Sequence, residues 1–294
     1  LQYVINSVLS DEEILSEFTA SRLPQDLIDY LKTYLKTVHG PLSIRSSSKL
    51  EHSYYQPFAG IYSTYMIPQT ENEDQFLRLL GKAITSVYAS VYFAASRAYI
   101  TATSNVISEE KMAVVIQEVC GTEDSGYFFP TLSGVARSEN FYPIDDEKAT
   151  DGIAKIAFGL GKAVVDGEQV LRFSPKDPKK VLQLSTPDLA LRETQRVMYA
   201  LNLMPEKFKT SPNDAVNLEK FEINDAKHFR NMRYAASTWD MQNQTIVDSP
   251  LGQGRKIITF AHILKYGTFP LPEILVDMLE ISLDEMSCSV EIEF

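Results

Sequence analysis

An arginine, a cluster of hydroxyls and a glycine turn occur together in residues 42–64, LSIRSSSKLEHSYYQPFAGIYST. Arg45 ends a short apolar run and precedes three serines, and the turn Phe58-Ala59-Gly60 is followed by Ser63 and Thr64. An arginine offers a planar fork of hydrogen-bond donors, and a glycine lets backbone N–H groups approach a ligand closely. The segment therefore predicts a site that holds a polyphosphate.

Both halves of this segment also have an alternative interpretation. Arg45 would then be a surface residue at the end of a strand, paired with Glu51. The Phe58-Ala59-Gly60 turn, which is short for a motif, would be a tight connection between two strands. The residue types alone leave these alternatives open.

Two carboxylates near the C-terminus have the spacing of a metal-binding strand. Glu291 and Glu293 alternate with Val290, Ile292 and Phe294, so in a strand both carboxylates point to one face and the apolar side chains point to the core. Carboxylate oxygens suit Mg²⁺, which shares its coordination with substrate phosphates. The alternative is a half-exposed strand whose charged residues face water.

Other candidate chemistry is weaker. The glycine-rich stretch 159–167 (GLGKAVVDG) has neither the Walker spacing nor the three-glycine dinucleotide fingerprint, so Lys162 is either a phosphate contact or a solvated loop lysine. No nucleophile elbow or metalloprotease pair occurs. The four histidines have no metal-ligand or nucleophile spacing: His39, His52, His228 and His262.

The elements that must position these residues follow from periodicity and capping signals. Ser10-Asp11-Glu12-Glu13 predicts a capping box at the start of a short helix, and Gly40-Pro41 ends a second helix that begins near Pro24. Further expected elements are a strand over 42–46, one long helix over 74–99, a buried strand over 112–119, a helix from Thr186-Pro187 to about Leu201, a helix over 272–279 and a strand over 290–294.

The bulk composition indicates an ordinary globular protein. The chain has 294 residues, 44% hydrophobic, which is enough for two lobes that we expect at 1–110 and 111–294. A net charge of −11 argues against broad nucleic-acid binding, and no apolar run is long enough to span a bilayer. The start has no secretory signal, and the two cysteines form no framework or zinc motif, so we expect a reducing compartment, the cytoplasm.

The motifs, in their order, resemble the nucleotide-binding domain of the phosphoenolpyruvate synthase and pyruvate phosphate dikinase family. Each motif is short, but the series covers the chain from about residue 20 to the last residue. It consists of Ile-Arg-Ser-Ser at 44–47 with Glu51, Phe58-Ala59-Gly60 with Thr64, the helix AITSVYASVY at 83–92 with Arg97 and Tyr99, AVVIQEV at 113–119, Ser133-Gly134-Val135, GLGKAVVDG and EIEF at 291–294.

The resemblance implies an α+β, ATP-grasp-like domain of two lobes that holds ATP between them, with Mg²⁺. Arg45 would contact the nucleotide phosphates, Gly60 and Thr64 would belong to the phosphate flap, and Glu291 and Glu293 would bind the metal. The hinge strand would read the adenine edge through backbone groups at Gln117, Glu118 and Val119. In the intact family enzyme a histidine on a mobile domain accepts the phosphoryl group and carries it to pyruvate.

This sequence also departs from the family pattern. An N-terminal glycine-rich segment with an ATP-contacting lysine and a final Leu-Gln-x-Arg strand are not seen, nor are the phosphohistidine and pyruvate-binding domains, which would be partners of this one. His52 stands where an aspartate is usual, Arg137 where Phe or Thr is commoner, and Glu291 where an aspartate is common. We therefore expect a part of a longer enzyme that by itself binds Mg·ATP weakly or not at all and forms no phosphoenolpyruvate.

Two other functions remain open at this stage. One is a sibling enzyme, such as an antibiotic phosphotransferase or a glucan dikinase, that uses the same domain on another acceptor. The other is a regulatory module that keeps the fold without the chemistry.

Overall fold

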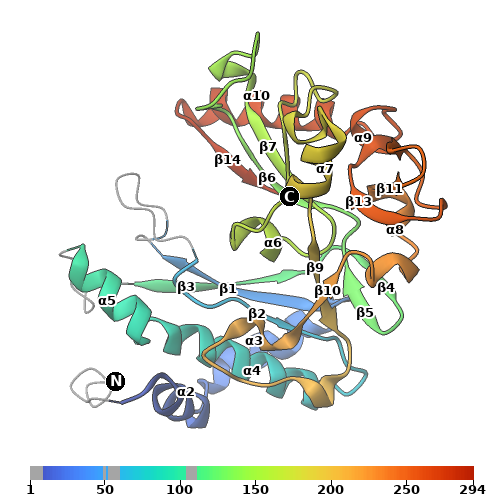
Figure 1. Ribbon diagram of the computed structural model, residues 1–294. Helices are drawn as coiled ribbons and strands as arrows, with labels where there is room; N and C mark the ends of the chain where they lie inside the picture. Colours follow the sequence, from blue (N-terminus) through green and yellow to red (C-terminus); the bar gives the residue numbers. More distant parts are fainter. Residues whose placement is uncertain (1–8, 49–50, 52–59, 104–110) are drawn as a thin grey trace. The chain divides into compact units, whose positions relative to one another are not determined.

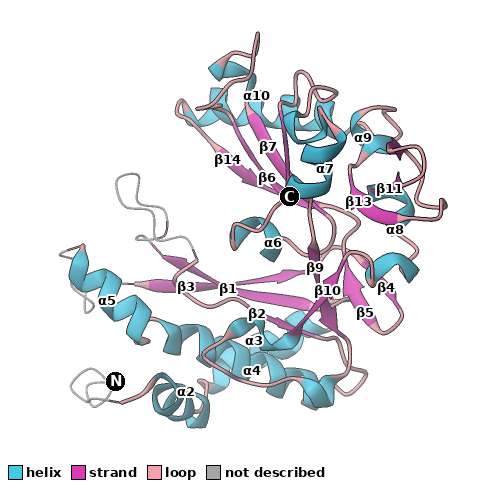
Figure 2. Cartoon of the chain, in the orientation of Figure 1, coloured by secondary structure: helices cyan, strands magenta, loops and turns pink. Residues whose placement is uncertain are grey.

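The computed structural model describes residues 9–48, 51, 60–103 and 111–294. His52, Phe58 and Ala59, which the sequence analysis singled out, lie outside the described residues. The helices and strands alternate irregularly along the chain (Figures 1 and 2), as in an α+β protein. Within the described part of the chain, no helix combines the length and the apolar character that a bilayer crossing requires.

The chain divides into two compact units that are discontinuous in sequence. Unit 1 comprises Leu1–Cys120, Gly126–Phe128 and Leu201–Glu219, and unit 2 comprises Gly121–Ser125, Phe129–Ala200 and Lys220–Phe294. From the sequence we expected two lobes at 1–110 and 111–294. That division is continuous along the chain, unlike the two compact units, and it stays a prediction.

Unit 1 is built on an antiparallel sheet of order β2-β1-β3. Helix α4 packs against these strands (Figure 1) through Phe76, Leu80, Ile84 and Val87, whose spacing makes one apolar stripe. The main elements are α2 (Asp11–Ala20), α3 (Gln25–Leu35), β1 (Leu42–Ser48), β2 (Tyr65–Ile67), α4 (Glu73–Ser90), α5 (Ala94–Ala102) and β3 (Met112–Glu118). Residues 201–219 add two 3₁₀ turns, η4 (Pro205–Lys207) and η5 (Asp214–Asn217).

The start of α2 confirms the predicted capping box. The Glu13 N–H donates to Ser10 Oγ at 3.2 Å, and the Ser10 N–H donates to Glu13 Oε2 at 2.8 Å. Two of the four donors that a helix N-terminus leaves without partners are satisfied in this way.

The single helix expected over 74–99 is wrong, because the structure has two helices there. Phe93 is extended, with φ −67° and ψ 157°, and separates α4 from α5. The Ser96 hydroxyl donates to the carbonyl of Ser90 at 2.6 Å and so satisfies an acceptor at the end of α4. Every residue of the break is apolar or aromatic, so periodicity alone could not reveal it.

Strand β3 is present as expected, but its predicted full burial is wrong. Its residues are half-buried or exposed, and Ala113 and Gln117 are exposed. Helix α4 covers the sheet face that carries Met112, Val114 and Ile116, which pack against the core of unit 1. The apolar run of β3 therefore has one core-facing side rather than two.

Unit 2 contains two further antiparallel sheets. One has the order β14-β6-β7-β8 and contacts α10, and the other has the order β12-β11-β13. The elements are β6 (Ser133–Arg137), η2 (Ala149–Asp151), β7 (Ile153–Ala157), α6 (Lys162–Val165), β8 (Leu171–Phe173), η3 (Leu182–Leu184), α7 (Pro187–Glu193), η6 (Ala226–His228), α8 (Met232–Ala235), β11 (Ala236–Asp240), β12 (Thr245–Val247), β13 (Arg255–Ile258), α9 (Ala261–Leu264), α10 (Leu271–Met286) and β14 (Glu291–Glu293).

A fourth sheet, of order β10-β9-β5-β4, contains the strands in which the chain passes from one unit to the other. Its strands are β4 (Thr122–Asp124), β5 (Tyr127–Phe129), β9 (Val197–Asn202) and β10 (Leu218–Glu222).

The helix expected from Thr186 to about Leu201 is correct only in its first half. Thr186 caps α7 by accepting from the Leu189 N–H, but α7 ends at Glu193, where the Thr194 hydroxyl donates to the carbonyl of Ala190 at 2.6 Å. The Gln195 carboxamide then bonds both the N–H and the carbonyl of Phe158, each at 2.8 Å. This tertiary contact holds the following residues extended, as β9.

The strand expected at 290–294 is confirmed as β14, and its close packing depends on a glycine. The N–H of Gly134 donates to the carbonyl of Phe294 at 2.8 Å, and the return bond is 3.0 Å. A Cβ at Gly134 would overlap the carbonyl oxygen of Lys155 and the ring of Phe294. Gly134 therefore lets β6 lie close to both of its neighbours.

Candidate functional site

Arg45 and Gln117 lie on one face of the unit 1 sheet. In the antiparallel register Arg45 is opposite Val115, and Ser43 is opposite Gln117. Side chains opposite each other share a face, and residues two apart in a strand also share it, so these four side chains point the same way. Leu42 and Ile44 point to the other face, into the core. We call the face with Arg45 and Gln117 the outer face.

Thr64 comes next to Arg45 at the end of the β1–β2 ladder. The last pair of that ladder joins Ile44 and Tyr65, so Arg45 and Thr64 are each one residue beyond it on neighbouring chains. Gly60 is exposed and has a φ of 79°, a left-handed conformation that glycine adopts without strain. The predicted arginine and Thr64, the last residue of the predicted flap, therefore lie next to each other at the end of the β1–β2 ladder.

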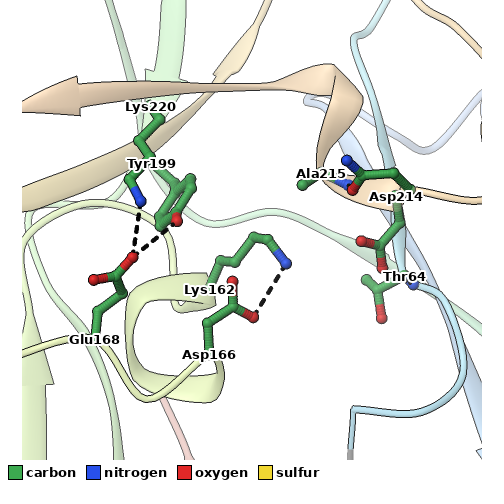
Figure 3. Close-up of polar contacts among 9 residues, drawn as sticks. Thr64, Lys162, Asp166, Glu168, Tyr199, Asp214, Ala215 and Lys220 are labelled. Atoms are coloured by element: carbon green, nitrogen blue, oxygen red, sulfur yellow. Dashed lines mark hydrogen bonds and ion pairs between the residues drawn. The ribbon is translucent and has the colours of Figure 1, made fainter.

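The backbone N–H groups around Thr64 already have acceptors. The Thr64 N–H donates to Asp214 Oδ2 at 2.8 Å, and the Ser63 N–H donates to Ser90 Oγ at 3.1 Å. Asp214 lies against Thr64 in Figure 3, although the two residues are 150 positions apart in the chain. Two of the amides in the predicted flap, those of Ser63 and Thr64, thus donate to protein oxygens.

Glu51, the alternative partner of Arg45 that the sequence suggests, forms hydrogen bonds with the serines that follow Arg45. Its carboxylate accepts from the Ser46 hydroxyl at 2.5 Å and from the Ser48 N–H at 2.8 Å, and the Glu51 N–H donates to Ser48 Oγ at 3.3 Å. Glu51 therefore closes the turn at the end of β1 by binding two of the three serines. The serine cluster supports the local backbone in this way.

The three hinge residues have different surroundings. Gln117 is exposed on the outer face, whereas the Glu118 carboxylate accepts from the His39 N–H at 3.1 Å. The Val119 N–H donates to the carbonyl of Pro41 at 2.8 Å, so that donor is used within the unit. Of the three, the Gln117 side chain faces the same way as Arg45.

In unit 2, Glu291 and Glu293 occupy alternate positions of β14 and are both exposed. Glu291 is directly opposite Arg137 of β6 and forms an ion pair with its guanidinium Nε. The two side chains of the pair are 46% and 56% exposed, so water screens the pair, and it adds little stability. Arg137, noted in the sequence as a departure from the family, is thus the neighbour of a predicted metal ligand.

The comparisons with known proteins decide the family. Residues 7–294 match the family model described as the pyruvate phosphate dikinase, AMP/ATP-binding domain. The chain belongs to this family. A curated relative, the uncharacterized phosphotransferase YvkC of Bacillus subtilis (strain 168), is 30% identical over 164 residues. That alignment covers 56% of this chain and 16% of the relative, so the chain spans only a small part of the relative's length.

Membership of the dikinase family implies a metal ion beside the nucleotide, and β14 offers ligands of the right kind. Mg²⁺ is commonly held by one or two carboxylates, with phosphate and water oxygens completing its coordination. Glu291 and Glu293 supply two carboxylates on one face, and the exposed pair with Arg137 is weak enough to be displaced. The described part of the chain contains no group of three or more metal-ligating side chains. The two glutamates therefore fit a metal that is completed by a ligand.

Residues that sequence reasoning missed form a polar cluster in unit 2 (Figure 3). Lys220 Nζ donates to Glu168 Oε1 at 2.9 Å, the Tyr199 hydroxyl donates to the same oxygen at 3.3 Å, and Lys220 lies 5.4 Å from the centre of the Tyr199 ring. The bond from Lys220 lowers the pKa of Glu168, and the carboxylate in turn raises the pKa of Lys220. Lys220 is 52 residues from Glu168, and no local signal joins them.

The glycine-rich stretch of the dikinase-family domain leads into the short helix α6. There Lys162, the predicted phosphate contact, forms an ion pair with Asp166 at 3.2 Å, one turn along the chain (Figure 3). The pair has the i, i+4 spacing that brings side chains together on a helix. Lys162 therefore has a local role that does not require a ligand.

Proposed function

We propose that this chain is the ATP-grasp-like, ATP-binding domain of a phosphoenolpyruvate synthase-type phosphotransferase. The observation that carries the proposal is the match of residues 7–294 to the AMP/ATP-binding domain of the dikinase family. Unit 1 supports it, because Arg45 and Gln117 share the outer face of the sheet that the family pattern assigns to the nucleotide, and Thr64 directly precedes β2 beside Arg45.

In this function the chain's own residues bind and orient ATP. The Arg45 guanidinium would hold phosphate oxygens by charge-assisted hydrogen bonds, and the amides near Thr64 would add neutral donors. Glu291 and Glu293 would hold Mg²⁺, which neutralises charge on the phosphates when bound. Positioning and charge neutralisation supply most of the catalysis in phosphoryl transfer.

The reaction proposed for the whole protein is ATP-dependent phosphorylation of a carrier histidine on another domain, followed by transfer to pyruvate. An imidazole nitrogen attacks a phosphorus of ATP, the phosphoanhydride P–O bond breaks, and the leaving phosphate oxygen keeps the electron pair. A base of the pyruvate-binding domain then takes a proton from the methyl group of pyruvate, and the enolate oxygen attacks the phosphorus of the histidine phosphate. The P–N bond breaks, and its electron pair returns to the imidazole nitrogen.

Calorimetric titration of the full-length protein with Mg·ATP tests the binding step. We expect Arg45→Ala to weaken binding at least tenfold, because it removes a charge-assisted contact to phosphate. Arg78→Ala is a matched control, since Arg78 is exposed on α4, which packs against the core-facing side of the sheet. Equal binding by wild type and Arg45→Ala would contradict the role of Arg45, and no binding by any variant would contradict the proposed function.

A non-catalytic module is the second candidate, and a specific observation favours it. The Thr64 amide and the Glu291 carboxylate both have protein partners, Asp214 and Arg137. If these contacts cannot be displaced, the domain keeps its fold without binding nucleotide. Incubating the full-length protein with ATP, Mg²⁺ and pyruvate and assaying for phosphoenolpyruvate separates the two candidates.

A further inference from the structure

The Thr64 amide donates to an acceptor that chemically resembles a phosphate. Its N–H donates to Asp214 Oδ2 at 2.8 Å, and both residues are half-buried in unit 1 (Figure 3). A carboxylate and a phosphate both offer anionic oxygens to an N–H donor, and such bonds are stronger than neutral ones. A carboxylate that accepts from this amide therefore resembles, in charge and in hydrogen bonding, the phosphate oxygen that the family pattern would bring there.

The segment that carries Asp214 is closed by its own side chains. Residues 209–217, which we call the Asp214 loop, begin and end at a pair of bonds between Lys209 and Asn217. The Lys209 N–H donates to Asn217 Oδ1 and the Asn217 carboxamide donates to the carbonyl of Lys209, each at 2.8 Å. Asn217 is only 7% exposed. The loop is thus closed at its base by a buried carboxamide.

The Asp214 loop is also attached to strand β2. The Tyr65 hydroxyl donates to the carbonyl of Ser211 at 2.6 Å, next to the bond from the Thr64 N–H to Asp214. Within the loop, the Asn213 side chain accepts from the Ala215 N–H at 3.1 Å and so caps η5, the turn that begins at Asp214. Two neighbouring residues, Thr64 and Tyr65 at the start of β2, therefore hold the loop in place.

We propose that Asp214 is an internal anion that occupies the phosphate-binding amide of Thr64, so that the Asp214 loop inhibits nucleotide binding until a phosphate displaces it. The inference rests on the proposed function, because it needs a phosphate ligand at Thr64. The apparent affinity for ATP is then the intrinsic affinity reduced by the fraction of molecules in which the amide is released.

The experiment compares Asp214→Ala and Asp214→Asn with wild type, and Glu206→Gln serves as a matched control. Glu206 lies in the same chain segment and is exposed, so its variant loses one negative charge without changing Thr64. Binding of Mg·ATP and of inorganic tripolyphosphate to the full-length protein is measured by calorimetry. Amide hydrogen exchange at Thr64 is measured without ligand.

We expect faster exchange at Thr64 and about tenfold tighter binding of both ligands in Asp214→Ala, with a smaller gain in Asp214→Asn, which keeps a neutral acceptor. Glu206→Gln should match wild type in both measurements. Faster exchange with unchanged Mg·ATP affinity would overturn this inference and leave the proposed function intact. Absence of Mg·ATP binding in wild type and in every variant would overturn both.

Discussion

Unit 1, which we propose binds phosphate, and unit 2, which we propose binds Mg²⁺, differ in the protein partners that their binding groups already have. In unit 1 a donor, the Thr64 N–H, has an anionic partner in Asp214, and that partner is held by a closed loop. In unit 2 an acceptor, the Glu291 carboxylate, has a cationic partner in Arg137, and both side chains are about half exposed.

This difference indicates which contact resists a ligand more strongly. In unit 1, the half-buried bond from the Thr64 N–H to Asp214 is supported by the hydrogen bonds that close the Asp214 loop and attach it to Tyr65. A phosphate that replaces Asp214 competes against this whole set of contacts. An exposed ion pair contributes at most about 1 kcal/mol and exchanges readily with water or a metal ion. We therefore expect unit 1, rather than unit 2, to limit ligand binding.

The largest expected effect concerns the strand that carries the carboxylates. Gly134→Ala should destabilise the protein by about 3 kcal/mol, because its Cβ overlaps the Phe294 ring and the Lys155 carbonyl, and that backbone carbonyl cannot move without separating strands. Thermal and urea unfolding measure the change. Gly161→Ala is the matched control, since its φ is −60° and its Cβ would be 3.8 Å from Ser133. Equal stability of the two variants would show that β14 does not depend on Gly134.

The next effect tests the attachment of the Asp214 loop by raising the pH. Burial, with a smaller contribution from the charge of Asp214, raises the pKa of Tyr65 to about 12 from its usual 10.0. The stability linked to this proton is complete below pH 10 and is lost as the pH rises towards 12, because the unfolded state ionises first. The loss amounts to about 2 to 3 kcal/mol.

Urea unfolding of wild type and of Tyr65→Phe is measured from pH 9 to 12. The difference between their unfolding free energies gives the loss, because the contributions of the other titrating groups cancel. Below pH 10 the variant should be less stable, since the carbonyl of Ser211 loses its donor. The gap should narrow towards pH 12. A gap that stays constant over this range would contradict a protonated, hydrogen-bonded Tyr65.

The smallest expected effect concerns the exposed pair in unit 2. Arg137→Ala should change the unfolding free energy by less than about 1 kcal/mol, yet it should increase the affinity of Glu291 and Glu293 for Mn²⁺, a probe for Mg²⁺. Electron paramagnetic resonance of free and bound Mn²⁺ measures that affinity. Lys32→Ala, at an exposed position of α3 in unit 1, removes the same charge from outside the sheet that carries Glu291 and Glu293 and controls for net charge. Equal Mn²⁺ affinity in both variants would argue against competition by Arg137.

The sequence predicted several elements correctly because their signals are local. The capping box at Ser10, the strand with Arg45 and the alternating strand at Glu291 each depend on residues a few positions apart. The break between α4 and α5 and the strand β9 were missed. Their causes are tertiary: the Ser96 hydroxyl bonds an earlier carbonyl, and Gln195 bonds Phe158, 37 residues away.

The sequence by itself determined the family and the residue types suited to a polyphosphate: Arg45, Gly60, Thr64 and the two glutamates. Only the tertiary structure decided which of their groups are already engaged. Asp214 reaches Thr64 across 150 residues, and Arg137 reaches Glu291 across 154. Hydrogen bonds form between groups that folding brings within about 3 Å, whatever their separation in the chain. A pattern read along one sequence therefore identifies a binding group, whereas the fold shows what that group must release before it can bind.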